Sequence, residues 1–121
     1  MPFDQKLRRH ERITQEHEYR TVIRQGKLVT GTGFKAYFLT GKDLRRKAGF
    51  IVGKGVGGAC DRNRAKRLLK EAYRRLKPGL KPQGFRVVFV ARQGLSQAES
   101  LEVASEMRGM FEKCGLLKEA R

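Results

Sequence analysis

Residues 53–69 read GKGVGGACDRNRAKRLL, a glycine-rich loop that runs directly into a strongly basic segment. Glycine allows backbone conformations that other residues rarely adopt, so residues 53–58 are expected to form a loop. From Asp61, the expected N-cap, apolar residues recur at helical spacing until a Pro-Gly pair ends the pattern. This stretch therefore predicts a loop followed by a helix over about residues 61–77.

The expected helix has one apolar face and one cationic face. At about 100° per residue, the face to be buried collects Ala65, Leu68, Leu69, Ala72 and Leu76. The opposite face, with Glu71 at its edge, collects Arg62, Asn63, Lys66, Arg67, Lys70 and Arg74. A solvated face usually mixes charges of both signs, whereas here cations recur at i, i+4 and i+8, which costs stability unless phosphates lie alongside. The pattern indicates contact with nucleic acid.

Asn63 stands among these cations and has two interpretations. Its amide can donate to and accept from a sugar hydroxyl or a base edge, which favours RNA contact. Alternatively, it caps or braces the glycine loop.

Shorter elements are expected on both sides of this helix. Their bounds are helix 14–25, strand 29–32, strand 34–39, strand 47–52, strand 85–91 and helix 96–114. The last helix begins at Ser96, which has Glu99 at the spacing of a capping box. The resulting order, α-β-β-β-α-β-α, predicts an α+β sandwich with helices over a central sheet. Residues 1–13 are polar and basic without periodicity, so we expect a flexible arm followed by a single RNA-binding domain over residues 14–121.

The charge of the chain favours a polyanionic partner. Among 121 residues, 28 Lys and Arg face 12 Asp and Glu, for a formal net charge of +16. Residues 96–121 contain four basic and five acidic side chains, so the remainder carries +17. Such an imbalance repels itself unless an anion such as nucleic acid neutralises it. The last segment is expected to pack or to face solvent.

The composition also bears on location. No run reaches the roughly 18 apolar residues of a membrane span, and the N-terminus has no apolar core typical of a signal peptide. Cys60 and Cys114 lie far apart, without partners at metal-ligand spacing, which is typical of free thiols. We therefore expect a soluble cytoplasmic protein with no membrane partner.

Several stretches together resemble the bacterial ribonuclease P protein family. The loop and helix match its signature at Lys54, Gly57, Ala59, Arg62, Asn63, Arg64, Lys66, Arg67, Leu68 and Leu69. Glu18, Tyr19, Val22 and Gly26 are similar to the family's first helix, and residues 34–39 and 88–92 to two of its strands. The chain departs from the family at three positions: the family usually has Lys where Gly55 stands, Arg where Lys70 stands and Phe where Tyr19 stands. Lys70 keeps the charge but loses the bidentate fork of arginine.

The resemblance implies a fold and a function. The fold is an α-β sandwich with a left-handed β-α-β crossover. The protein would be the non-catalytic subunit of an endoribonuclease, binding the catalytic RNA one to one, while that RNA uses Mg²⁺ to remove the 5′ leader of precursor tRNA. No cofactor or metal bound by the protein itself is expected. The resemblance assigns contact with the RNA subunit to Lys54, Arg62, Asn63, Arg64, Lys66, Arg67, Lys70 and Arg74.

The family also implies a cleft between the first helix and the sheet that holds the single-stranded leader. Alternation places Lys35 and Tyr37 on one face of their strand, and Val88 and Arg92 on one face of theirs. Apolar or aromatic residues combined with cations suit stacking and phosphate contact. The expected cleft residues are Tyr19, Ile23, Lys35, Tyr37, Val88 and Arg92. The alternative is that both tyrosines only fill the core beneath the first helix.

The sequence offers no pattern for catalysis by the protein. Its carboxylates are sparse before the last helix and form no two-metal motif, and His10 and His17 have no recognisable acid–base partner. Residues 53–58 lack the Gly-Lys-Ser/Thr ending of a P-loop. Two other classes stay open: a ribosomal or RNA-chaperone protein, and a membrane-active cationic protein. The latter needs a long amphipathic segment with exposed apolar residues, whereas this helix has a narrow Leu/Ala stripe suited to packing.

Overall fold

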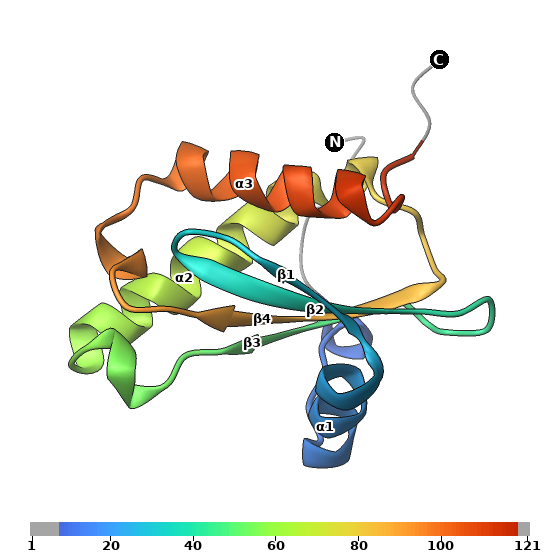
Figure 1. Cartoon of the computed structure of the whole chain (residues 1–121), viewed down its shortest axis with the longest axis horizontal. Helices are drawn as coiled ribbons and strands as arrows, with labels where there is room; N and C mark the ends of the chain where they lie inside the picture. The colour runs from blue at the N-terminus through green and yellow to red at the C-terminus, as the bar shows by residue number, and fades with distance from the viewer. Residues whose placement is uncertain (1–7, 119–121) are drawn as a thin grey trace.

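A computed structural model describes residues 8–118 of the chain. Helices α2 and α3 lie over one face of a four-stranded sheet, and α1 lies against the other face (Figure 1). The elements in chain order are α1 (Glu16–Gln25), β1 (Lys27–Thr30), β2 (Phe34–Thr40), β3 (Lys47–Ile51), α2 (Ala59–Leu76), β4 (Phe85–Ala91) and α3 (Ser100–Lys113). The predicted α+β sandwich and its element order are confirmed.

The strands are arranged in the order β1-β2-β4-β3. Antiparallel pairing joins β1 to β2 and β2 to β4, whereas β3 runs parallel to β4. Since α2 connects these two parallel neighbours, β3-α2-β4 is a β-α-β crossover. In this strand order β4, the last strand in the sequence, lies in the interior of the sheet, between β2 and β3.

The main core lies between the sheet and the pair α2 and α3. Phe34 and Phe38 of β2 and Phe85 and Phe89 of β4 point into it and are almost completely buried. Phe111 of α3 meets three of these rings edge-on, with centroids 5.2 to 6.1 Å apart. Because side chains alternate along a strand, Lys35 and Tyr37 of β2 lie on the opposite face, as the sequence predicted, and that face is left for α1.

Tyr73 of α2 is a core residue that the helical wheel did not select. Its side chain is fully buried beside Phe50 and Phe111, whereas Leu76, assigned to the core, is only partly buried. Within residues 8–118 the Tyr73 hydroxyl has no hydrogen-bond partner, and burial raises the pKa of this phenol strongly. Only the packing of three elements around this ring makes the position apolar enough to accept it.

Helix α2 begins earlier than its side chains indicated. Gly58, not Asp61, is the N-cap, and Asp61 lies within the first turn. Gly57 adopts a φ of 143°, and a Cβ there would lie 2.5 Å from a carboxylate oxygen of Asp61. This turn requires glycine and directs the chain into the helix two residues before the expected start.

The start of α3 and the bounds of β1 also differ from expectation. Ser96 does not cap the helix: it lies buried in a 3₁₀ turn, Leu95–Gln97, and Glu99 is the N-cap. The turn packs against α2, which explains why the capping-box spacing misplaced the boundary. Strand β1 ends at Thr30, two residues before the predicted end of this strand.

Residues 8–13, expected within a flexible arm, are docked on the domain. Ile13 is buried, and its backbone N–H donates to the Ala48 carbonyl of β3 at 3.0 Å. Glu11 accepts from Lys77 Nζ at 2.8 Å and from Arg46 Nη2 at 3.3 Å, all three side chains being largely buried. These partners are distant in sequence, so no local pattern could reveal them. The first seven residues of the predicted arm lie outside the described residues.

Candidate nucleic-acid interface

The outward face of α2 brings together most of the cations predicted for RNA contact. A shallow groove of about 400 Å³ runs along it, lined by Asn63, Lys66, Arg67, Lys70, Glu71 and Arg74. Glu71 accepts from Arg74 Nη2 at 2.8 Å and so offsets the charge of Arg74. Within residues 8–118, Lys66, Arg67 and Lys70 form no ion pair with a carboxylate. The groove therefore offers several cations to an anionic ligand.

Lys70 lies where this face of α2 meets the docked N-terminal segment. It lines a hollow of about 160 Å³ together with Arg12, Lys66 and Tyr19. Burial and, after it, the positive charges of Lys66 and Arg12 lower the pKa of Lys70. A phosphate group between these three cations would relieve their repulsion. Arg12 was missed by the sequence analysis because only tertiary docking brings it here.

Two further predicted residues extend the cationic face, and one does not. Lys54 is exposed in the 3₁₀ turn Lys54–Val56 just before α2, and Arg62 is partly exposed in the first turns of the helix. Arg64, in contrast, turns toward α3, where its Nε donates to the Ser96 carbonyl. Arg64 therefore links α2 to the turn before α3 and lies outside the groove, and its contact with the RNA subunit stays a prediction.

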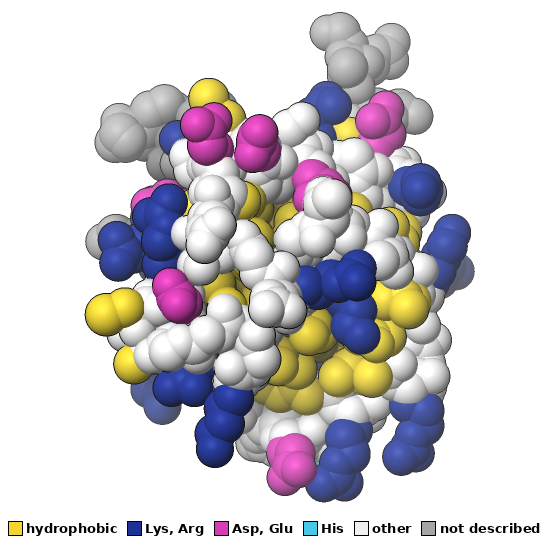
Figure 2. All heavy atoms as spheres, turned by 60° about the vertical axis from the view of Figure 1, so that its left-hand side comes forward, with side chains coloured by type: hydrophobic (Ala, Val, Ile, Leu, Met, Phe, Trp, Pro, Cys, Tyr) yellow, Lys and Arg dark blue, Asp and Glu magenta, His cyan; other side chains and the backbone are white. Residues whose placement is uncertain are grey.

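The sheet face that carries α1 is only partly covered by this helix (Figure 1). A small apolar cluster lies there, with Ile13, Val22 and Val88 buried at its centre. In Figure 2, hydrophobic side chains gather in a hollow between the sheet and α1, with Lys and Arg side chains around it. The partly exposed members of the cluster are Tyr19, Ile23, Tyr37, Leu39, Ile51 and Val90.

Tyr37 and Lys35 lie side by side on the β2 strand of this face. The Lys35 Nζ is 5.7 Å from the centroid of the Tyr37 ring, a cation–π distance. Arg92 follows β4 at the same end of the sheet, and its Nη1 donates to the Gly31 carbonyl at 3.1 Å. Along this face Arg92, Lys35 and Tyr37 follow one another in that order, so two cations lie on one side of an aromatic ring. Such an arrangement can stack a base on the ring and contact the neighbouring phosphates.

Val88 does not line an open cleft, contrary to the prediction. Its side chain is fully buried beneath α1, against Val22 and Ile13. The strand alternation correctly gave its face, but not how far α1 reaches across that face. Val90 and Ile51, which are partly exposed, hold the positions that were expected of Val88.

Tyr19 both packs α1 against the sheet and lines the hollow between α1 and the sheet. Its ring lies against the backbone of β3, where a Cβ on Gly49 would lie 2.5 Å from the ring edge. Burial raises the pKa of the Tyr19 hydroxyl, with a smaller opposing effect from the Phe50 backbone N–H. Gly49 therefore provides the room that the ring needs, and only part of the ring is open to a ligand.

An ion-pair cluster holds the start of α1 on the sheet. Glu18 lies 2.8 Å from Lys47 Nζ and 3.9 Å from Arg86 Nη1. The hydrogen bond from Lys47 lowers the pKa of Glu18 more than burial raises it. These contacts tie the first turn of α1 to β3 through Lys47 and to β4 through Arg86.

The described residues contain neither a metal-binding cluster nor a membrane-spanning helix. Between residues 8 and 118, no three His, Cys, Asp or Glu side chains come together in a group suited to a metal ion. Over the same residues, no helix combines the length and the apolar character needed to cross a bilayer.

Comparison with known proteins identifies the family. The sequence matches the family model described as Ribonuclease P over residues 7–115. The chain belongs to the ribonuclease P protein family. The ribonuclease P protein component of Dehalococcoides mccartyi is 34% identical over 111 residues, which cover 92% of this chain and 90% of the relative. That of Exiguobacterium is 29% identical over 107 residues, covering 88% and 92%.

Solved structures of ribonuclease P proteins share the fold. The protein from Staphylococcus aureus superposes with a TM-score of 0.75 at 20% identity, covering 100% of both chains. The protein from Thermotoga maritima gives a TM-score of 0.72 at 24% identity, covering 85% of this chain and 96% of the other. Membership of the ribonuclease P protein family makes the chain a component of a tRNA-processing ribonucleoprotein. It thereby favours this class over the ribosomal and membrane-active alternatives.

Proposed function

We propose that this protein binds the RNA subunit of ribonuclease P through the outward face of α2, and the 5′ leader of precursor tRNA in the hollow between α1 and the sheet. Its role is to promote endonucleolytic removal of the leader. Hydrolysis belongs to the RNA subunit with Mg²⁺, and the protein holds no metal of its own. The complex contains one protein per RNA and acts in the cytoplasm.

The observation that carries this proposal is the row of cations on α2, Lys66, Arg67 and Lys70, which form no ion pair with a carboxylate of residues 8–118. Lys66, Arg67 and Lys70 face solvent on one side of a rigid helix, and Arg12 joins them from the docked N-terminal segment. Cations held at fixed spacing bind successive backbone phosphates and release counterions, which gives strong, salt-dependent RNA affinity. Asn63, in the same groove, can contact a sugar hydroxyl.

The hollow beside α1 supports a different kind of RNA contact. A single-stranded leader has unstacked bases, which bind aromatic rings such as that of Tyr37. Lys35 and, beyond it along the same face, Arg92 lie on one side of the ring and suit the backbone phosphates. Because the hollow and the α2 face lie on different sides of β3, one protein can hold both RNAs at once.

Reconstitution tests the whole proposal. The protein is combined with its cognate ribonuclease P RNA and a precursor tRNA carrying a 5′ leader at low Mg²⁺, and cleavage is compared with that by the RNA alone. We expect a clear gain in rate, because added cations replace part of the charge screening otherwise supplied by Mg²⁺. Equal rates with and without folded protein, at saturating concentration, contradict the proposal.

A further inference from the structure

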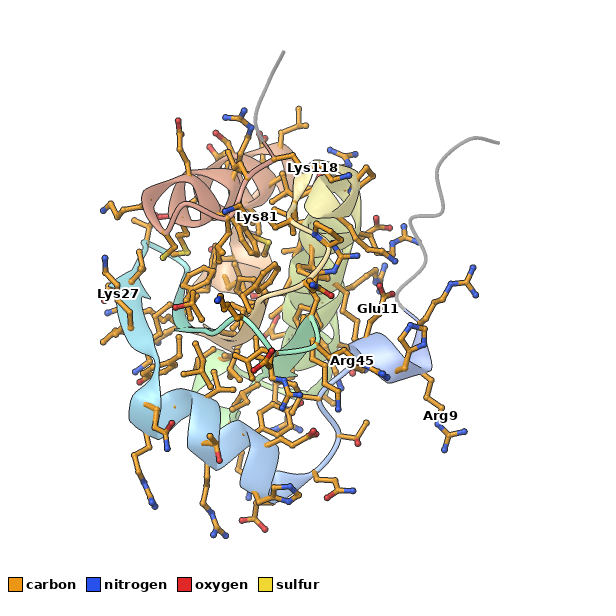
Figure 3. All side chains as sticks on the ribbon, turned by 90° about the vertical axis from the view of Figure 1, so that its right-hand side faces the viewer. Arg9, Glu11, Lys27, Arg45, Lys81 and Lys118 are labelled. Atoms are coloured by element: carbon orange, nitrogen blue, oxygen red, sulfur yellow. The ribbon has the colours of Figure 1, made fainter. Side chains whose placement is uncertain are left out.

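A second basic surface lies at the end of the molecule where α2 finishes. It surrounds a hollow of about 730 Å³ formed by the turn Arg9–Glu11, the β2–β3 loop and the α2–β4 loop. His10, Arg45, Arg46 and Gln83 contribute to its lining. Figure 3 shows Arg9, Arg45, Lys81 and Lys118 spread over this end of the molecule. Its volume lies in the range of ordinary ligand sites, about 300–1,000 Å³.

The hollow has a rigid frame. Arg46 Nη1 donates to the Lys81 carbonyl at 3.0 Å and Nη2 to Glu11 Oε2 at 3.3 Å, so one guanidinium ties together all three segments. Glu11 is anchored in turn by Lys77, whose Nζ lies 2.8 Å from its other oxygen. Side chains on such a frame lose less entropy on binding than those on a mobile loop.

The charges around the hollow are mostly of one sign. Arg9, Arg45 and Lys81 are exposed at its rim. Two carboxylates among residues 8–118 line the hollow, Glu11 and Asp43. The charge of Glu11 is offset by its ion pairs with Arg46 and Lys77, so Asp43 is the carboxylate that could repel an anion there. A merely solvated surface would be expected to alternate its charges. This surface instead favours an anion with several charged groups.

We propose that this end is a second RNA-binding surface, which holds the phosphate backbone of an RNA segment other than the one on the α2 face. The proposal relies on the proposed function only for the identity of the polyanion. From Arg62 to Lys77, α2 spans about 22 Å at 1.5 Å per residue. Arg62, at the N-terminal end of the α2 face, therefore lies more than two Debye lengths of about 8 Å at physiological salt from this end, whereas Arg74 and Arg12 lie closer to it.

The test compares two variants with the same loss of charge. Arg45→Gln/Lys81→Gln removes two rim cations while keeping the backbone carbonyls that accept from Arg86 and Arg46. Arg20→Gln/Arg108→Gln removes two exposed cations from the outer surfaces of α1 and α3. Affinity is measured against salt concentration for the cognate RNA subunit and, separately, for precursor tRNA bound by the assembled complex.

We expect the rim variant to lose about three- to thirtyfold in affinity at moderate salt. Its log–log salt slope should fall by about 1.4–1.8, as removal of two phosphate contacts requires, with the control unchanged. Weaker affinity of the rim variant for the RNA subunit would show that the bound segment belongs to that RNA. Weaker affinity for precursor tRNA alone would show that it belongs to the tRNA. Unchanged affinity and slope in both assays, with circular dichroism intact, overturn the proposal.

A third variant, Lys66→Gln/Arg67→Gln, separates this proposal from the proposed function. If this α2 variant binds RNA normally while the rim variant is weakened, the assignment of α2 fails and the second surface stands. If only the α2 variant is weakened, the second surface fails and the assignment of α2 stands.

Discussion

Helices α2 and α3 pack together on the same face of the sheet, yet they present different surfaces to solvent. Between its ends, α2 carries seven Lys and Arg against two Asp and Glu, whereas α3 carries two against three. Their buried faces are alike in kind, with Leu69 and Ala72 on one and Met107 and Phe111 on the other. The apolar pattern thus fixes where each helix packs, and the outward charge fixes what each can bind.

Among residues 8–118, Glu106 of α3 has hydrogen-bond partners within the domain, unlike Lys66 and Arg67 of α2. Glu106 accepts from the Thr32 backbone N–H at 2.7 Å and from its hydroxyl at 2.8 Å, which ties α3 to the β1–β2 turn. Within residues 8–118, Lys66 and Arg67 of α2 have no comparable bond. We infer that α3 faces away from the RNA, and that the cations of α2 are kept for a ligand.

The largest expected effect comes from Glu11, which pairs with Lys77 just after α2 and with Arg46 before β3. Glu11→Gln leaves the largely buried Lys77 and Arg46 beside a neutral amide, which should reduce the free energy of unfolding at pH 7 by about 3–5 kcal/mol. Urea unfolding measures this loss. The control Glu16→Gln breaks an exposed pair with Arg20 and should change stability by less than about 0.5 kcal/mol.

The same variant predicts a dependence on pH. Burial raises the pKa of Glu11, but hydrogen bonds from Lys77, the Arg8 backbone N–H and Arg46 together outweigh burial and hold it below 4.5. The stabilisation by Glu11 is therefore complete above pH 4.5 and is lost as the pH falls through the lower folded-state value. The stability gap between wild type and Glu11→Gln should narrow in acid. A gap that stays constant down to pH 3 contradicts this account.

The contrast between α2 and α3 is tested directly by removing single cations. Arg62→Ala, Lys66→Ala and Arg67→Ala should each weaken binding to the RNA subunit by about 1–3 kcal/mol, or roughly 5- to 150-fold. Arg108→Ala on α3 serves as the control and should bind as wild type does. If all three α2 variants keep both their circular dichroism and their RNA affinity, the two helices do not differ in function.

The opposite face of the sheet offers a further comparison, because substitutions there should change only the affinity for RNA that carries the 5′ leader. Tyr37→Ala should reduce affinity of the assembled complex for precursor tRNA roughly ten- to hundredfold, since base stacking is worth about 1–3 kcal/mol. Affinity for mature tRNA and for the RNA subunit should not change, and Tyr37→Phe should retain most of the binding. An unaltered ratio of precursor to mature tRNA affinity in folded Tyr37→Ala would mean that the leader binds elsewhere.

Tyr19→Ala should lower the same ratio less than Tyr37→Ala does, because part of the Tyr19 ring packs against β3 and only the remainder is available to RNA. Its cost should appear mainly as lost stability in urea. A ratio that falls more than in Tyr37→Ala would place the stacking platform on α1.

The smallest expected effect is stabilisation by simple anions. Sulfate or pyrophosphate at about tenfold above its Kd should add about 1.4 kcal/mol to the free energy of unfolding and raise the Tm by several degrees. Lys66→Gln/Lys70→Gln should reduce this gain, whereas Arg108→Gln should not. A Tm that responds to neutral osmolytes but not to these anions would argue against clustered anion sites.

The sequence predicted whatever depends on local pattern. Alternation placed Phe34 and Phe89 on the core face, and helical periodicity separated the cations of α2 from Leu69. The family resemblance added the functional assignment, which periodicity alone could not provide. Capping patterns were less reliable, because Ser96 is buried by tertiary packing instead of starting a helix.

What the sequence did not reveal depends on contacts between distant segments. Arg12 reaches Lys66 and Lys70 only because the N-terminal segment docks on β3. Arg64 and Lys66 are two residues apart on a basic helix, yet the first bonds to the turn before α3 and the second faces solvent. Residue type could not distinguish them, since the difference is set by where α3 lies.

The interior position of β4 has a consequence for how the chain is made. Among the strands of residues 8–118, β3 pairs with β4 alone, which follows it by some 40 residues. At a synthesis rate of about 5–20 residues per second, β3 waits roughly 2–8 s for its partner to emerge. During this interval the ribosome carries a β1–β2 hairpin, an unpaired strand and the basic helix α2. The sheet can be completed only after this interval, once β4 is available to lie between β2 and β3.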